Sequence, residues 1–319
     1  MARVALDLDT VEDYQPAMTY SPRQLSGLHA LSHHYDVVLS DIWGVVHNGL
    51  AAYEEACAAL TAFRQQGGTV VLITNAPRPC GPVSRQLAHL QVPSAAYDAI
   101  VTSGDVALSL MAARGTQPLF HIGPERDLAL LEELSRRVPV MPERVGLDKA
   151  EYVLCTGLTH DDKAPADFAT SLLPAPIEAM LAAMKLRNLP MICANPDIIV
   201  HVGDELYYCA GALGERYKAL GGQTTYSGKP YAPIYHEALR LAAQKRGQDT
   251  DLARVLAIGD AMHTDVAGAS LQGIDVLMVT GGIHREAMHA PAGGLDVALA
   301  EAFLQGETHQ PTFIIDALR

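Results

Sequence analysis

Short apolar runs alternate with amphipathic stretches in the first third of the chain. The run Val37–Leu39 is β-branched, too short for a helix and followed by a turn at Gly44, which is typical of a buried strand. Residues 53–66 repeat apolar side chains at helical spacing and end at Gly67, and residues 69–73 predict the next buried strand. This alternation predicts a doubly wound α/β fold with a mainly parallel sheet and right-handed crossovers.

The same alternation restarts after residue 114 and later returns to the first pattern. The middle of the chain predicts strands at 118–122, 152–155 and 191–193, a hairpin from 198–202 and 205–209, and a helix over 210–220. Strands of the first pattern resume at 255–258, 275–280 and 313–315. We therefore predict an N-terminal extension (1–31), a core (32–114 and 224–319) and an inserted α/β cap domain (115–223).

Composition narrows the class of protein. Of the 319 residues, 49% are apolar, which predicts a globular protein with a sizeable core. The formal charge is −13 with lysine and arginine scattered singly, so nucleic acid is not expected as a partner. Five widely spaced cysteines without a CxxC pair predict reduced thiols, and no apolar run approaches the roughly 18 residues that span a bilayer. We expect a cytoplasmic protein without a membrane partner.

Residues that carry chemistry follow several of the predicted strands. They are Asp41, the pair Thr74 and Asn75, Lys229 in a Gly-Lys-Pro turn, and the acidic pair Asp260 and Asp265. In open α/β sheets ligands bind at the carboxyl ends of the strands, so these side chains are expected to meet there. Converging carboxylates repel each other unless a cation lies between them, and oxygen ligands suit Mg²⁺. Mg²⁺, a lysine and a hydroxyl together suit a phosphoryl group, which a carboxylate can attack.

A second acidic pattern, Asp7-Leu8-Asp9-Thr10, lies near the start of the chain. Few residues precede it and Glu12 and Asp13 follow it, which leaves little room for a core strand. We therefore take Asp41 as the reactive residue.

In their order, Asp41-Ile-Trp-Gly-Val, Thr74-Asn75, Gly228-Lys229-Pro230 and Gly259-Asp260 with Asp265 resemble the four motifs of the haloacid dehalogenase (HAD) superfamily. The similarity extends over about residues 33–290, and the insertion that contains Ala194-Asn-Pro-Asp197 resembles the cap of the class IIA (NagD-like) branch. The resemblance implies a hydrolase that acts on a small phosphorylated metabolite, with a cap that selects the leaving group. It also implies a possible homodimer through the cap.

Residue by residue, the resemblance implies Asp41 as nucleophile and Lys229 as the residue that neutralises it. Phosphate or substrate ligands would be Thr74, Asn75, Gly44, Asn195 and Asp197, although Asn195 and Asp197 also suit a plain structural turn and Thr74-Asn75 a helix cap. Mg²⁺ would be held by Asp41, the backbone carbonyl of Trp43, Asp260 and Asp265.

Trp43 is a departure from the family pattern DxD, whose second aspartate serves as acid and base. General acid-base catalysis contributes roughly 10²- to 10⁴-fold, so alkyl phosphates should react poorly and acyl or aryl phosphates less so. His47 is the nearest substitute acid, and alternatively it lines the entrance. Trp43 itself suits either the pocket floor or stacking on an aromatic or sugar ring.

Two other functions stay open. One is a catalytically weak HAD-like protein that binds a phosphorylated metabolite without turnover, which Trp43 favours. The other is a hydrolytic dehalogenase, since an aromatic residue two positions after the nucleophile resembles that branch. Dehalogenases need no metal, which would leave Asp260 and Asp265 unexplained.

Overall fold

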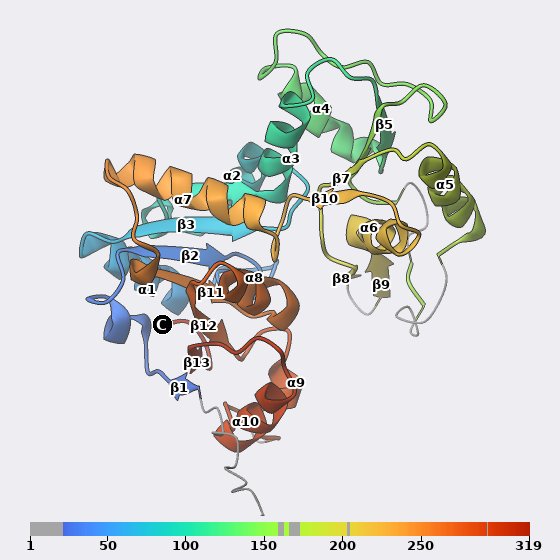
Figure 1. Cartoon of the computed structure of the whole chain (residues 1–319). Coiled ribbons are helices and arrows are strands. Elements are labelled where there is room, and N and C mark those ends of the chain that lie inside the picture. Colours follow the sequence, from blue (N-terminus) through green and yellow to red (C-terminus); the bar gives the residue numbers. More distant parts are fainter. Residues whose placement is uncertain (1–21, 159–162, 166–172, 203–204, 292) are drawn as a thin grey trace, which may run out of the picture.

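The computed structural model describes residues 22–158, 163–165, 173–202, 205–291 and 293–319. Its larger part is a seven-stranded parallel sheet in the order β1-β13-β12-β11-β2-β3-β4 (Figure 1). The strands are β1 (Arg23–Gln24), β2 (Val37–Asp41), β3 (Thr69–Thr74), β4 (Ala99–Thr102), β11 (Val255–Gly259), β12 (Asp275–Val279) and β13 (Phe313–Ile315). The predicted doubly wound α/β core is confirmed.

Helices cover both faces of this sheet because neighbouring residues of a strand point to opposite sides. In β2, Val38 packs on the face covered by α1 (Glu54–Gln65) and α2 (Cys80–His89). Val37 and Leu39 pack on the other face, which is covered by α7 (Ala232–Arg246), α8 (Ala267–Leu271) and α10 (Val297–Gln305). The short helix α9 (Arg285–Met288) adjoins α10, and short turns of helix lie at Leu28–Leu31, Ser94–Ala96, Leu252–Arg254 and Met262–Val266.

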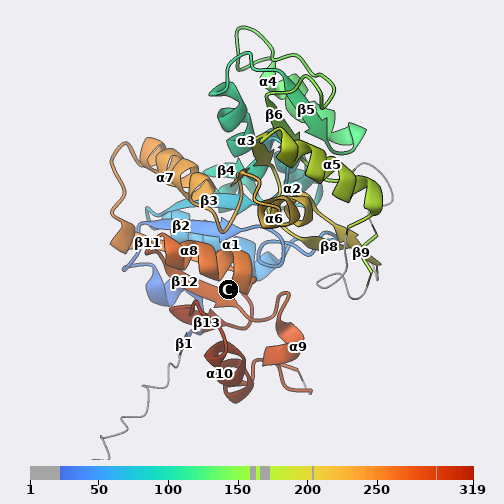
Figure 2. The same ribbon diagram turned by 45° about the vertical axis from the view of Figure 1, so that its right-hand side comes forward.

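The second part is a smaller parallel sheet, β10-β7-β6-β5, that lies beside the first (Figure 2). Its strands are β5 (Leu119–Ile122), β6 (Tyr152–Cys155), β7 (Met191–Cys193) and β10 (Thr224–Tyr226), and its helices are α4 (Ala129–Leu134), α5 (Ala175–Leu186) and α6 (Ala210–Ala219), with a 3₁₀ turn at Glu125–Leu128. The predicted hairpin is present as antiparallel β8 (Ile199–Val202) and β9 (Glu205–Tyr208).

Helix α3 (Ser103–Ala112) contacts both the cap and the core. Its Val106 packs in the core of the large sheet, whereas Leu108 and Met111 pack with Leu119 and Tyr152 of the cap strands. All five side chains are buried, so α3 packs against both the core and the cap.

Two predicted domain boundaries are wrong. The segment after residue 22 is no extension, because β1 pairs in parallel with β13 and Leu28 and Leu31 are buried in the main core. At the other boundary, β10 pairs with β7, so residues 224–226 belong to the cap and the chain returns to the core only after Tyr226. The first boundary was missed because β1 has only two residues, which is too short to show an apolar pattern. The second was missed because the sequence of a strand does not show which strand it pairs with.

Within the part of the chain that the structure describes, no helix is both long and apolar enough to cross a membrane. All five cysteines lie among the described residues, and none of them is in a disulfide. The pattern Asp7–Thr10 lies outside the described residues.

Candidate active site

The predicted residues do meet at the carboxyl edge of the large sheet. Strands β2 and β11 are neighbours, so Asp41, the last residue of β2, and Asp260, directly after β11, reach the same edge. One carboxylate oxygen of each of Asp41, Asp260 and Asp265 lies within 4.8 Å of the others, and all three residues are buried. In Figure 1 the arrowheads of β2 and β3 point toward the cap, so this edge faces the junction of the two parts.

Lys229 reaches this acidic group from the chain segment that leaves the cap. Its Nζ donates to Asp41 Oδ1 at 2.5 Å and to Asp265 Oδ1 at 2.6 Å, and its side chain is only 3% exposed. Burial opposes the charge on Lys229, but the neighbouring carboxylates of Asp265 and Asp41 outweigh it and raise its pKa. Lys229 is therefore a buried ammonium bound to two carboxylates.

The acidic cluster carries more negative charge than Lys229 balances. Burial raises the pKa of Asp41 well above its ordinary value although Lys229 opposes this, and it raises the pKa of Asp260 to about 6, with the charge of Asp265 adding to the effect. Three carboxylates and one ammonium sum to a formal charge of −2, which a divalent cation would neutralise. A buried, all-oxygen donor set of this kind fits Mg²⁺.

Asp265 has a positioning function as well. Its Oδ2 accepts the backbone N–H groups of Asp260 at 3.2 Å and Ala261 at 3.1 Å, while its Oδ1 accepts from Lys229. These contacts fix the loop after β11, so Asp265 holds both Asp260 and Lys229 in place.

Gly44 is required for a different reason from the predicted one. Its N–H donates to the carbonyl of His47 at 2.9 Å, so that group is not free to bind phosphate, and this prediction is wrong. Gly44 has φ +79°, and a Cβ there would lie 2.1 Å from Asp260 Oδ2. Only glycine allows this backbone to pass so close to the metal-ligand candidate.

Asn75 joins three parts of the site and does not offer a free phosphate ligand. Its Nδ2 donates to Asp197 Oδ1 at 2.8 Å and to the carbonyl of Lys229 at 3.1 Å, and its Oδ1 accepts the N–H of Lys229 at 2.7 Å. The side chain has no further proton to donate, so the predicted phosphate contact is corrected to a link between core, cap and Lys229.

Thr74 keeps a hydroxyl proton, since its Oγ1 only accepts a bond from Ala76 N–H at 3.3 Å. The alternative of a helix cap is wrong, because α2 begins at Cys80. Of the two cap residues, Asp197 reaches the site through Asn75, whereas Asn195 Oδ1 accepts the N–H of Asp197 and forms the structural turn.

Trp43 and His47 belong to one tight loop. Trp43 is 56% exposed, so it does not form a pocket floor. His47 is buried; its Nδ1 accepts the N–H of Gly49 at 2.9 Å, and burial lowers its pKa. A neutral imidazole with its acceptor nitrogen engaged is a poor proton donor near pH 7, which weighs against the predicted acid role. The metal-ligand role of the Trp43 carbonyl stays a prediction.

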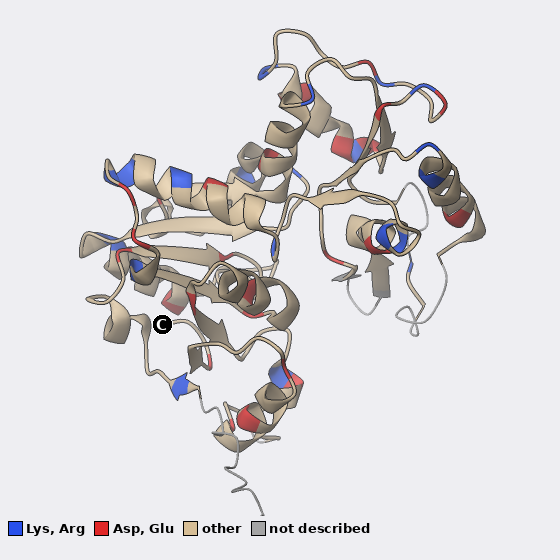
Figure 3. Cartoon of the chain, viewed as in Figure 1, with Lys and Arg blue, Asp and Glu red and all other residues tan. Residues whose placement is uncertain are grey.

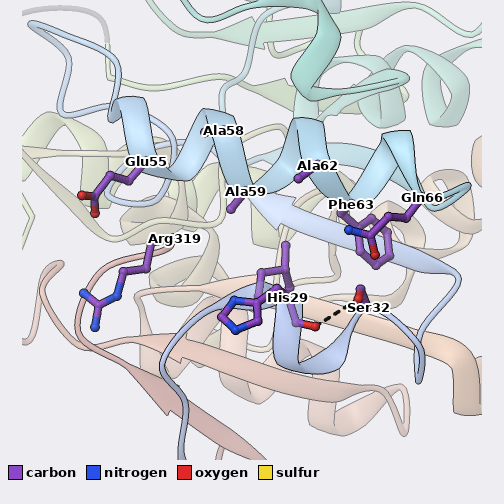
Figure 4. A pocket seen from close by; sticks show the side chains of 10 residues that line it. His29, Ser32, Glu55, Ala58, Ala59, Ala62, Phe63, Gln66 and Arg319 are labelled. Atoms are coloured by element: carbon purple, nitrogen blue, oxygen red, sulfur yellow. Dashed lines mark hydrogen bonds between the residues drawn. The ribbon is translucent and has the colours of Figure 1, made fainter.

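A hollow of about 430 Å³ lies elsewhere, between α1 and the turn Leu28–Leu31, with Phe63, His29 and Arg319 among its lining residues (Figure 4). None of its lining residues belongs to the acidic cluster, and no sequence pattern predicted this hollow.

Comparison with known proteins identifies the family of the chain. The family profile of the haloacid dehalogenase-like hydrolases matches residues 38–136, and a HAD-hydrolase-like profile matches residues 226–319, together more than half of the chain. The chain belongs to the haloacid dehalogenase-like hydrolases. It is thus a hydrolase, and the predicted superfamily with its class IIA branch is confirmed.

Three relatives illustrate the range of similarity. A haloacid dehalogenase-like hydrolase from Brucella suis 1330 is 41% identical with a TM-score of 0.73, over 93% of this chain and 100% of its own. The 5'-nucleotidase YutF of Bacillus subtilis (strain 168) is 25% identical, over 80% of this chain and 91% of its own length. A glycerol phosphate phosphatase from Mycobacterium tuberculosis, solved with calcium, is 22% identical with a TM-score of 0.58, over 88% of this chain and 77% of its own.

Proposed function

We propose that the chain is a Mg²⁺-dependent phosphohydrolase that works through an aspartyl-phosphate on Asp41. The observation that carries the proposal is the position of Lys229 Nζ, 2.5 Å from Asp41 and 2.6 Å from Asp265, with Asp260 beside them. The relatives named as a nucleotidase and a glycerol phosphate phosphatase support the same reaction class. The substrate would be a small phosphorylated metabolite.

In the proposed reaction, a carboxylate oxygen of Asp41 attacks phosphorus while the bond to the leaving oxygen breaks. Lys229 neutralises Asp41 and the incoming phosphate, and the hydroxyl of Thr74 donates to a phosphate oxygen. Water then attacks phosphorus, the bond to Asp41 breaks, and phosphate leaves. Bound Mg²⁺, held by Asp41 and Asp260, would supply charge stabilisation.

The test is turnover of acetyl phosphate and 4-nitrophenyl phosphate at millimolar Mg²⁺. We expect release of phosphate, and a loss of about 10³-fold or more in Asp41→Asn, because the nucleophile is removed. Asp249→Asn, on an exposed residue of the core, is the matched control and should keep full activity. A folded chain that binds phosphate esters without any turnover would instead favour the binding-protein alternative.

A second experiment tests the missing acid. We expect Trp43→Asp to raise kcat for glycerol phosphate, up to the roughly 10²- to 10⁴-fold that acid-base catalysis contributes. Trp43→Asn is the control, because asparagine has nearly the same size as aspartate but no carboxyl group that could act as an acid. Equal rates in both folded variants would show that this site does not lack an acid at position 43.

A further inference from the structure

Two tyrosines lie at the ends of the turn that carries Lys229. Tyr226 is the last residue of β10 in the cap sheet, and Tyr231 directly precedes α7 of the core. Their rings are stacked, with centroids 4.2 Å apart and an angle of 9° between the two planes. Residues 227–230 therefore form a short loop whose two ends are joined by aromatic packing, and Lys229 lies in this loop.

Helix α6 of the cap holds both rings. Glu215 Oε1 accepts the hydroxyl proton of Tyr226 at 2.7 Å and that of Tyr231 at 3.2 Å. Gly214 leaves room for the ring of Tyr226, since a Cβ there would lie 2.8 Å from Cε1 of that ring. Tyr226 is buried in the hydrophobic core of the cap, and Tyr231 packs against the same core although its chain continues into α7. We call Tyr226, Tyr231 and Glu215 the tyrosine clamp.

Buried hydrogen bonds tie the same loop to both parts of the molecule. Ser227 Oγ donates to the carbonyl of Cys193 in the cap at 3.0 Å, which leaves the hydroxyl of Ser103 to donate to Ser227 at 2.8 Å. Ser103 is the first residue of α3, and the N–H of Lys229 donates to Asn75 of the core. The backbone around Lys229 is thus bonded to the cap and to the core at once, so a shift of the cap would pull on this loop.

We propose that the tyrosine clamp positions Lys229, so that its Nζ stays against Asp41 only while the cap is seated on the core. This inference rests on the proposed phosphohydrolase function, in which Lys229 neutralises Asp41 and the phosphate. The clamp acts through the backbone of the loop, and its tyrosines and Glu215 are positioning residues. A displacement of about 1 Å in a catalytic group can cost roughly 10²-fold in rate, so a loosened loop should lower kcat.

The alternative is that the stacked rings only contribute to the stability of the fold. A structural role predicts the loss of stability that follows the removal of any well-packed ring. A positioning role predicts in addition a local effect on the loop that carries Lys229.

Hydrogen exchange of residues 227–231 reports on the loop without requiring turnover. The N–H groups of Ser227, Lys229 and Tyr231 are all hydrogen-bonded, so loosening of the loop would speed their exchange. We expect Tyr231→Leu to raise the exchange rates about tenfold, the size of one good aromatic pair, and to lower kcat for acetyl phosphate at least about tenfold. Tyr231→Phe keeps the stacked ring and should retain most of the protection and of kcat.

Tyr97→Leu is the matched control, because Tyr97 is also a partly buried tyrosine and packs against the main core. It should lower the melting temperature and leave both the exchange of residues 227–231 and kcat unchanged. Glu215→Ala is a second variant, which keeps both rings and removes the acceptor of their hydroxyl protons. We expect it to raise the exchange rates about fivefold, as for the loss of one hydrogen bond.

Unchanged exchange of residues 227–231 in Tyr231→Leu and in Glu215→Ala would overturn the proposal. Faster exchange with unchanged kcat would also overturn it, because the loop would then be loosened without consequence for Lys229. Failure of the proposed function would be distinct, since the unsubstituted chain would then turn over neither acetyl phosphate nor 4-nitrophenyl phosphate. The exchange rates would still decide whether the clamp holds the loop.

Discussion

The two parallel sheets of this protein have similar topology and very different carboxyl edges. The strands of the large sheet end in Asp41 and Thr74 and lead to Asp260, whereas β6 and β7 of the cap end in Cys155 and Cys193. Both thiols are fully buried, and burial raises the pKa of Cys155 to about 12. Among the described residues, a cluster of three metal-ligating side chains occurs only at the large sheet. The carboxyl edge of a parallel sheet is therefore a position where an active site can form. Whether one forms depends on the side chains at the strand ends.

Charge shows the same contrast. Figure 3 shows lysines and arginines dispersed over the helices and loops of both parts. Lys229 is buried at the edge of the large sheet, and it follows β10, the last strand of the cap sheet. The core thus supplies the carboxylates, and the segment returning from the cap supplies the cation that balances them.

The largest expected effect follows removal of this cation. Lys229→Met leaves buried carboxylates unpaired, which typically costs about 3–5 kcal/mol, and removes a charge that stabilises the transition state, for a loss of at least about 100-fold in kcat. Urea unfolding in the presence of a chelator and phosphatase assays measure both. Lys245→Met, on the exposed end of α7, is the control and should change neither.

The next largest effect is expected from a substitution of Gly44. Gly44→Ala and Gly115→Ala both place a side chain at positive φ, which costs about 1–3 kcal/mol of backbone strain. Only at Gly44 would the new methyl group displace Asp260, since nothing lies within 4 Å of a Cβ on Gly115. We expect similar losses in thermal stability and a loss of Mg²⁺-dependent activity in Gly44→Ala alone. Equal activity of the two variants would contradict the steric argument.

Metal removal should show a pH dependence. In the metal-free protein the pKa of Asp260, raised by burial to about 6, lies above its ordinary value of 3.8. The folded state therefore holds this proton more tightly, and its contribution to stability is lost as pH rises through about 6. Mg²⁺ needs the ionised carboxylate, so its stabilising effect should be larger at pH 7.5 than at pH 5.

Thermal unfolding with and without Mg²⁺ at the two pH values measures this effect. Saturation at 100 times the Kd would stabilise by about 2.7 kcal/mol. Asp260→Asn should abolish the difference between the two pH values. An unchanged difference would place the metal elsewhere.

The smallest expected effect concerns the link between core and cap. Asp197→Ala removes the bond from Asn75, worth about 1 kcal/mol, and should raise KM for phosphate esters about fivefold. The rate with acetyl phosphate, which needs little from the cap, should stay within about twofold. Asp148→Ala, on an exposed cap residue, is the control. A change in kcat alone would show that Asp197 acts on the chemistry rather than on the position of the cap.

The sequence by itself determined the α/β class, the inserted cap and the choice of Asp41, Lys229 and Asp260 as candidate site residues. Apolar runs of strand length and polar residues directly after them are local features, and parallel pairing brings strand ends to one edge whatever lies between them. The hairpin after β7 was also predictable, because its two strands are close in sequence.

The tertiary structure alone decided how these residues are used. Three features depend on contacts between segments that are far apart in the chain. Asn75 uses its amide group to link the core with the cap, Gly44 lets the backbone pass close to Asp260, and β10 pairs within the cap sheet. The exposure of Trp43 also could not be predicted from the sequence, because the burial of a side chain depends on which other segments pack against it. Local pattern fixes which groups arrive at the sheet edge, and only packing determines which of their atoms remain free to meet a substrate.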